Sequence, residues 1–302
     1  MTVVEERKNN YPCVTLKGIK NFDVGKIFDC GQCFRFNPVP DTPHEVEFSG
    51  VAYGRFISVG QDGDEIYLYN TDAEDFENIW KSYLALDEDY GAISADIASR
   101  SENPALERAI RVGEGIRILR QEPWEAICSF IVSQNNNIPR IKKIIEAMSK
   151  KCGEIVSVPE EMLHKVSPLT ELYSFPAPEA LVREGADGLF ALKTGFRAKY
   201  IYDAAKKAAD GKIDYEYLRS SDDTSECVRR LCEIKGVGPK VASCALLFGF
   251  ARYDAFPVDV WIKKVIAKYF SDGGEEFSPE LLGSYAGIAQ QYLFYYERYC
   301  NQ

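Results

Sequence analysis

Apolar and polar positions alternate through much of the first seventy residues of this 302-residue chain. The stretches EVEFSGVAYGRFISVG and DEIYLYN are rich in aromatic side chains and are broken by Gly and Asp-Gly turns. Alternation sends every second side chain to the same face of a sheet. The pattern therefore predicts an antiparallel sheet at the N-terminus.

A helical spacing of apolar residues follows. Thr71 and Glu74 form a capping-box pattern, which predicts a helix start at Thr71. From about Asn103 onward, helices are predicted over residues 103–119, 123–134, 138–151, 196–209, 224–234, 239–250, 257–270 and 279–299, several of them opening on Pro. The fold class is therefore α+β. We expect a twisted antiparallel β domain with a flanking helix over residues 1–102 and a mostly helical domain over residues 103–302.

Composition narrows the class of protein. No apolar run reaches membrane-spanning length and the N-terminus lacks a signal-peptide core, so we expect a soluble cytoplasmic protein without a membrane partner. Nine scattered cysteines fit reduced thiols better than a disulfide framework. The net charge is −10, but acidic residues crowd positions 62–89, whereas lysines and arginines recur between positions 142 and 207. The net negative charge therefore does not exclude a local basic face that binds a polyanion such as DNA.

Several kinds of active site are disfavoured. Cys30 and Cys33 form a Cys-x-x-Cys on strand-like sequence without a second pair, and His44 and His164 are the only histidines. Neither a zinc site nor a His-based catalytic triad is expected. The chain also has no P-loop and no Rossmann fingerprint, so we expect no metal and no organic cofactor.

The segment KGVGPKVA, residues 235–242, predicts a helix, a Gly-Val-Gly turn and a second helix near Pro239. Gly236 and Gly238 would let backbone N–H groups face a DNA phosphate at the helix N-terminus. The alternative is a plain turn between two helices, with Lys240 as a surface residue.

Nineteen residues after Lys240, FPVDVW places Asp259 just inside a helix predicted to open on Pro257. An acid in the first turn can simply complement the helix dipole. Together, however, the two residues offer an amine among apolar neighbours and an anionic partner. Desolvation would favour the neutral amine that can act as a nucleophile.

These two segments resemble the helix-hairpin-helix DNA glycosylase superfamily, whose signature is such a hairpin with a catalytic lysine and a downstream aspartate. Further stretches resemble its 8-oxoguanine DNA glycosylase branch: GQCFRF (31–36), SQNNNIPRI (133–141), TGFRAKY (194–200) and YAGIAQQYLF (285–294). The matches run in the family's order from residue 31 to residue 294.

The resemblance implies a bifunctional DNA glycosylase/AP lyase that excises 8-oxoguanine from damaged double-stranded DNA. Lys240 would attack C1′ of the damaged nucleotide, leaving an imine that can undergo β-elimination. Asp259 would support the positive charge that develops on the sugar. The resemblance also implies cytosine as the preferred opposite base, formamidopyrimidine guanine as a further substrate and a monomeric enzyme.

Other residues receive implied binding roles. Contacts with the flipped-out base are implied for Gly31, Cys244, Pro257, Gln290 and Phe294. Contacts with the opposite cytosine and the DNA strands are implied for Asn135, Arg140, Phe196, Arg197, Gly236, Gly238 and Trp261. Structural alternatives remain open for some: Asn137 can be a helix N-cap, and Gly31 can merely permit a tight turn.

The chain departs from the family pattern at two positions. Trp261 stands where a His is usual near the 5′ phosphate, and Ser243 replaces an acidic neighbour of the lysine. Two other functions stay open at this point: a sister glycosylase for alkylated bases, and a hairpin module that binds DNA without catalysis. Lys240 argues against the first, since those relatives commonly lack the lysine.

Overall fold

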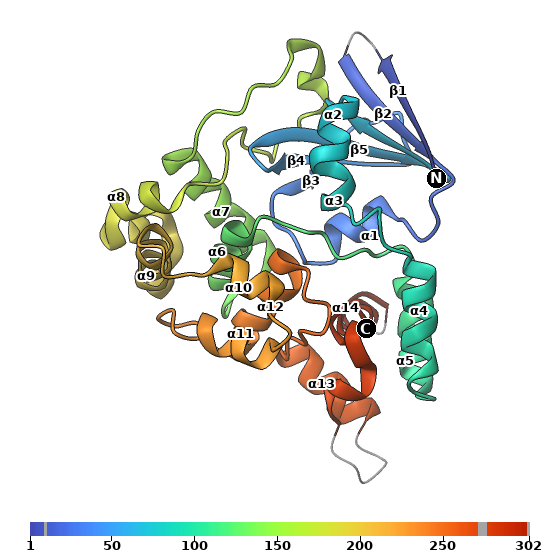
Figure 1. Cartoon of the computed structure of the whole chain (residues 1–302). Coiled ribbons are helices and arrows are strands. Elements are labelled where there is room, and N and C mark those ends of the chain that lie inside the picture. Colours follow the sequence, from blue (N-terminus) through green and yellow to red (C-terminus); the bar gives the residue numbers. More distant parts are fainter. Residues whose placement is uncertain (9–10, 271–276, 301–302) are drawn as a thin grey trace.

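The computed structural model describes residues 1–8, 11–270 and 277–300 (Figure 1). Its N-terminal part is a six-stranded antiparallel sheet in the order β1-β2-β6-β5-β4-β3. The strands are β1 (Thr2–Lys8), β2 (Tyr11–Lys17), β3 (Phe36–Pro38), β4 (Val46–Ala52), β5 (Arg55–Asp62) and β6 (Glu65–Tyr69). The predicted antiparallel sheet is confirmed.

Both faces of the sheet are covered, which explains its apolar strands. In β2, Val14 and Leu16 face one cluster, which contains Trp80, whereas Tyr11 and Cys13 face another, which contains Met162. Because successive side chains of a strand point to opposite faces, β2 contributes to a hydrophobic cluster on each side of the sheet. Figure 1 shows the short helices α2 (Ala73–Asp75) and α3 (Lys81–Tyr83) against the sheet. A π-helical turn (Phe76–Trp80) joins them.

The rest of the chain is mostly helical, as predicted. Its helices are α4 (Tyr90–Ser99), α5 (Pro104–Gly113), α6 (Pro123–Ser133), α7 (Ile138–Cys152), α8 (Pro178–Leu189), α9 (Ala198–Ala209), α10 (Tyr215–Ser220), α11 (Thr224–Leu231), α12 (Pro239–Phe250), α13 (Val260–Tyr269) and α14 (Ala286–Tyr295). Short 3-10 or π turns lie at Glu160–Lys165, Phe190–Thr194, Gly195–Arg197, Pro279–Tyr285 and Tyr296–Cys300. The α+β fold class is confirmed.

Buried polar side chains join the sheet to the helices. Gln32 follows α1 (Val24–Asp29), and its amide nitrogen donates to the carbonyls of Ile27 and Arg117, at 2.9 and 2.8 Å. Gln121 in turn donates to the Gln32 carbonyl at 2.7 Å. Amide groups buried this deeply are stable only when hydrogen-bonded. The turn that carries Gly31 is therefore held firmly against the helical part.

Two predicted helix ends are wrong in position. Asp72, rather than Thr71, caps the helix after β6, because the Asp72 carboxylate accepts from the Asp75 amide. The helix predicted over residues 103–119 ends at Gly113, since Gly115 has a φ of 94°. A left-handed glycine cannot continue an α-helix.

Two later predictions also change. Pro257 precedes α13 instead of opening it, and Asp259 is its N-cap instead of a residue in its first turn. The segment predicted as one helix over residues 279–299 is a 3-10 turn followed by α14, because Gly283 has a φ of 68°. A π turn then follows α14.

Candidate active site

The predicted hairpin is present between α11 and α12. Gly236 has a φ of 77°, and a Cβ there would lie 2.5 Å from ring carbons of Tyr200. Glycine is therefore required both for the backbone conformation and for the close approach. Gly238 is the N-cap of α12 without a capping side chain, and Pro239 occupies the first turn. The helix start thus leaves backbone donors for an anion.

Lys240 follows Pro239 in the first turn of α12 and is half-buried. Its Nζ atom donates to the Ser133 hydroxyl at 3.3 Å and lies 5.6 Å from the centre of the Phe130 ring. One helical turn further along α12, Cys244 is buried. Burial raises the pKa of the Cys244 thiol, whereas the charge of Lys240 and a hydrogen bond from it lower that pKa. The amine and the thiol are therefore close neighbours.

Asp259 reaches the same region from α13. Its Oδ1 atom accepts from the backbone amides of Trp261 and Ile262, at 2.9 and 2.8 Å. The charge of Asp259 raises the pKa of the Cys244 thiol, as burial does more strongly. Lys240 and Asp259 thus both act on one buried thiol. Within the described residues, however, the two form no ion pair with each other.

A second group of predicted residues meets at the Gly31 turn. Gly31 has a φ of 84°, and a Cβ there would lie 3.3 Å from Cδ1 of Ile138 and 3.7 Å from Cε1 of Phe294. Gln290, one turn before Phe294 on α14, is 5 % exposed, and its Oε1 atom has no hydrogen-bond partner in the described structure. Such an orphaned acceptor costs free energy in a folded protein. It therefore suits a ligand that donates to it.

Gln291, which follows Gln290, fixes α14 to the Gly31 turn. Nε2 of Gln291 donates to the Cys30 carbonyl at 3.0 Å. Pro257, the remaining predicted base contact, is buried in the segment that leads to α13. The Gly31 turn, α14 and the start of α7 are thus brought together.

The loop of three asparagines between α6 and α7 has two distinct parts. Asn137 caps α7 by accepting from the Arg140 amide at 3.0 Å, so the N-cap interpretation holds for this residue. Asn135 is exposed and has a φ of 46°. Left-handed backbone is tolerated by Asn better than by most residues. Capping thus explains the asparagine at position 137 but not the one at position 135. Asn135 and Arg140 are both exposed to solvent.

Arg197 lies beneath this loop rather than on its surface. Arg197 is 2 % exposed, and its guanidinium donates to the carbonyls of Gln134, Asn135 and Thr194. Burial, followed by the nearby charge of Arg140, lowers the pKa of Arg197. Any contact of this guanidinium with a DNA base would replace some of these bonds. In the free protein Arg197 supports the Asn135 loop.

Phe196, the predicted wedge, is 48 % exposed. Its ring lies 4.4 Å from the Arg197 guanidinium carbon and 5.9 Å from the Tyr200 ring, which also packs on Gly236. The exposed wedge is therefore coupled to both the loop and the hairpin. Trp261 is half-buried on α13, where the Lys264 ammonium lies 4.7 Å above its ring.

No metal site emerges from the described part of the chain. No group of three or more His, Cys, Asp or Glu residues there could hold an ion. The Cys30-Gly-Gln-Cys33 segment was predicted on strand-like sequence but lies at the end of α1 and in the turn after it. Both cysteines are buried, and burial raises the pKa of Cys30 to about 12. Such thiols are poor ligands and nucleophiles.

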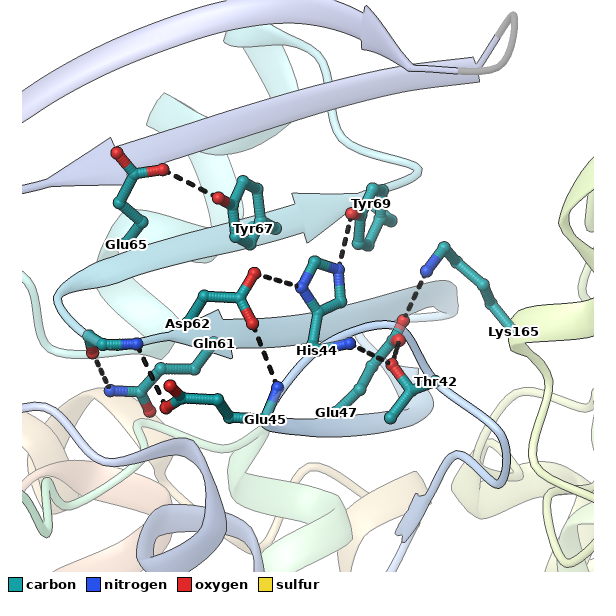
Figure 2. A network of polar contacts seen from close by, with 11 residues as sticks. Thr42, His44, Glu45, Glu47, Gln61, Asp62, Glu65, Tyr67, Tyr69 and Lys165 are labelled. Atoms are coloured by element: carbon teal, nitrogen blue, oxygen red, sulfur yellow. Dashed lines mark hydrogen bonds and ion pairs between the residues drawn. The ribbon is translucent and has the colours of Figure 1, made fainter.

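Sequence reasoning missed a polar network on the sheet, drawn in Figure 2. His44 bonds Asp62 at 2.8 Å and the Tyr69 hydroxyl at 2.7 Å, and Lys165 forms a buried ion pair with Glu47 at 2.8 Å. Lys165 lies on the segment between α7 and α8, so this network ties that segment to β4. It stands apart from Lys240 and belongs to the architecture of the sheet.

None of the helices within the described ranges is long and apolar enough to span a bilayer.

Known families match nearly the whole chain. The family described as "8-oxoguanine DNA glycosylase, N-terminal domain" matches residues 15–127, and "HhH-GPD superfamily base excision DNA repair protein" matches residues 128–280. The chain belongs to the HhH-GPD superfamily. Its resemblance to the 8-oxoguanine DNA glycosylase branch is confirmed.

Solved structures of the HhH-GPD superfamily agree over the full length. MBOgg1, solved in complex with a low affinity DNA ligand, is 40 % identical, with a TM-score of 0.86 and 100 % of each chain covered. The Clostridium acetobutylicum 8-oxoguanine glycosylase/lyase, solved with double-stranded DNA containing cytosine opposite 8-oxoG, is 34 % identical, with a TM-score of 0.86 and 100 % and 99 % of the chains covered.

A curated relative gives the activity class. The N-glycosylase/DNA lyase of Saccharomyces cerevisiae is 38 % identical over 161 residues, which are 50 % of this chain and 41 % of the yeast protein. The match therefore spans less than half the length of that relative. With the family matches, it identifies this HhH-GPD protein as a DNA-binding enzyme of the N-glycosylase/DNA lyase class.

Proposed function

We propose that this enzyme excises 8-oxoguanine from duplex DNA, with cytosine opposite the lesion, and then cleaves the strand as a lyase. The observation that carries the proposal is the position of Lys240. Its amine lies at the hairpin, beside a buried thiol and a serine hydroxyl, and forms no ion pair within the described residues. A lysine amine that acts as a nucleophile attacks through its lone pair, so it must be free of an ion pair at that moment. The Clostridium relative was solved with DNA that carries 8-oxoG opposite cytosine, which supports the same substrate.

In the proposed mechanism, Nζ of Lys240 forms a bond to C1′ while the bond from C1′ to the base breaks. The base departs with that electron pair and is protonated. The attached amine then loses a proton, the sugar ring opens and an imine forms. Loss of a C2′ proton expels the 3′ phosphate by β-elimination. Asp259 stabilises the positive charge on the sugar, since its Oδ2 atom makes no hydrogen bond within the described residues while Oδ1 caps α13.

We propose that the flipped-out base lies between Phe294 and Cys244, with Pro257 beside it. Gln290 would bond its pairing edge, because the buried Oε1 atom of this residue lacks a partner in the described structure. The Gly31 carbonyl would accept from N7–H, a proton that 8-oxoguanine has and guanine lacks. Flipping a base costs a few kcal/mol, which these contacts must offset. Formamidopyrimidine guanine keeps an N–H at this position and is the second proposed substrate.

The opposite strand is proposed to meet the exposed group around the Asn135 loop. Asn135 would fill the space that the base vacates, and Arg140 would donate to the acceptors of the orphaned cytosine. Phe196 would wedge between neighbouring bases, and Arg197 would join the cytosine contact after releasing part of the loop. The amides at Gly236 and Gly238 would hold a phosphate, and the Trp261 indole would serve another.

We further infer that the enzyme acts as a monomer and that its two domains divide near residue 102. The sheet-based part supplies Gly31 to the base pocket, whereas the helical part supplies Lys240 and Asp259. The proposed pocket therefore uses both parts of the chain.

Borohydride reduction tests the proposal, because it converts an imine between enzyme and DNA into a stable adduct. The wild-type enzyme should be trapped on a duplex with 8-oxoguanine opposite cytosine and not on the undamaged duplex. Lys240→Gln should abolish trapping, yet bind the lesion with affinity close to wild type, because the hairpin contact uses backbone groups. The matched control is Lys235→Gln, which removes an exposed lysine from the same turn. This control should be trapped like the wild type. An adduct with Lys240→Gln would overturn the assignment.

A further inference from the structure

The amine of Lys240 has few polar neighbours. Within the described residues its Nζ atom donates to the Ser133 hydroxyl at 3.3 Å and also lies beside the Cys244 thiol, and no carboxylate forms an ion pair with it. Ser133 is the last residue of α6, whereas Lys240 lies in the first turn of α12. A contact between two separate helices fixes the amine relative to the scaffold and not merely to its own helix.

The direction of this hydrogen bond is set by a third group. The Ser133 hydroxyl donates to the Phe130 carbonyl at 2.8 Å. A serine hydroxyl has a single proton and two lone pairs. With the proton committed to Phe130, the oxygen can only accept from Lys240. If Ser133 donated to a neutral amine instead, it would occupy the nitrogen lone pair that has to attack.

The acceptor is also uncharged. A carboxylate at this position would favour the ammonium form, which has no lone pair and cannot attack. Asp259, the nearby acid, is held at the start of α13 by two backbone amides and makes no ion pair with Lys240 within the described residues. The amine is therefore oriented by an uncharged oxygen and not by a carboxylate.

We propose that Ser133 is a positioning residue for the nucleophile: it accepts one N–H of Lys240 and leaves the lone pair free, with the Phe130 carbonyl fixing this direction. The inference rests on the proposed role of Lys240. Its signal in the sequence is a hydroxyl residue two positions before the first asparagine of the loop, and such a residue is equally compatible with a plain helix end.

Removal and rescue of the hydroxyl test this role. Ser133→Ala should lower the single-turnover rate of borohydride trapping on 8-oxoguanine duplex by about tenfold, the size expected for losing one orienting hydrogen bond. Ser133→Thr should restore most of the rate, because a threonine hydroxyl can also bond the carbonyl three residues earlier in a helix. Ser129→Ala is the matched control, since it removes a buried hydroxyl one turn earlier on α6. It should leave the rate unchanged.

A pH profile separates positioning from a purely structural role. Ser133→Asp replaces the neutral acceptor with a carboxylate, so its trapping rate should reach half of its maximum at a higher pH than in the wild type. A side chain at position 133 that did not contact the amine would change stability without moving this profile. If Ser133→Ala does not fold, the pH profile of Ser133→Asp still tests the positioning role of Ser133.

Lys240→Gln, measured in parallel, distinguishes the two possible failures. If Lys240→Gln is still trapped, the proposed nucleophile is wrong. If Lys240→Gln is not trapped while Ser133→Ala reacts at the wild-type rate, only the role of Ser133 is overturned. A Ser133→Asp profile that coincides with the wild-type profile overturns it as well.

Discussion

At the scale of single residues, the proposed mechanism gives Asp259 two tasks in one side chain. One carboxylate oxygen caps α13, and the charge of the group would stabilise the reacting sugar. Asparagine can supply the capping oxygen but not the charge. The two tasks can therefore be separated by substitution.

We expect Asp259→Asn to slow single-turnover base release by roughly 10²-fold with little loss of lesion affinity, because the charge acts in the transition state. The thermal midpoint should change little, since the cap is kept. Asp223→Asn is the matched control: Asp223 caps α11 in the same way, by accepting from the Glu226 amide at 2.9 Å. An unchanged rate in folded Asp259→Asn would exclude the electrostatic role.

Gly31 makes a separate residue-scale prediction about discrimination. If its carbonyl accepts from N7–H, recognition follows that proton and not the C8 oxygen. Normal guanine would leave the carbonyl unpaired at a cost of about 1–3 kcal/mol. Formamidopyrimidine guanine should be excised, whereas 8-methoxyguanine, which keeps the oxygen and loses the proton, should not. Release assays on the two duplexes check this, and efficient release of 8-methoxyguanine would refute it.

At the scale of elements, the loop between α6 and α7 presents two arginines in opposite ways. Arg140 is exposed on the first turn of α7, whereas Arg197 is buried beneath the loop. The free protein thus has one arginine exposed to solvent and one that donates to the loop carbonyls. We therefore expect Arg140 to affect the preference for the opposite base and Arg197 to affect the conformation of the loop.

Arg140→Ala should relax the preference for cytosine by about 1–3 kcal/mol, or roughly tenfold to hundredfold in the ratio of excision rates. Single-turnover rates opposite C, A, G and T measure this ratio. Lys143→Ala removes an exposed cation further along α7 and should keep the preference. A wild-type ratio in Arg140→Ala would show that other groups read the opposite base.

Among the helices and strands, those with a local sequence signal could be predicted from the sequence. Alternation located the central strands, and Pro-opened apolar spacing located α6 and α12, because these signals are local. The end of the helix after Asn103 differs from the prediction because Gly115 is left-handed. The start of α13 differs because Asp259 is the N-cap and not a residue of the first turn. The inward turn of Arg197 was also missed, because three carbonyls from two separate segments attract its guanidinium. No local pattern records such a contact.

At the scale of the whole molecule, a buried cluster of ionisable side chains links the sheet part to two helices. Arg35, which precedes β3, is 2 % exposed and lies 3.9 Å from Glu125 of α6 and 3.7 Å from Glu146 of α7. Burial raises the pKa of Glu125 to about 8 and that of Glu146 to about 7, although Arg35 opposes the shift. Both carboxyls therefore keep their protons in the folded state at a pH where the unfolded chain has lost them.

The free energy of unfolding should fall as the pH rises from about 5 to 8. In this window the folded state binds more protons than the unfolded state, which costs about 1.4 kcal/mol per pH unit for each carboxyl involved. Glu125→Gln should flatten this fall, whereas Glu107→Gln, an exposed control on α5, should not. Urea unfolding across this range measures the slope. An equal slope in wild type and Glu125→Gln would contradict the shifted carboxyl.

The whole molecule brings Lys240, Ser133 and Asp259 together from three helices, α12, α6 and the cap of α13. In the proposed mechanism, the amine of Lys240 forms the covalent bond to DNA. Mass spectrometry of the peptides after borohydride trapping on an 8-oxoguanine duplex tests this bond directly. A reduced sugar adduct is expected on the peptide that carries Lys240. An adduct on another lysine or on the N-terminal amine would contradict it.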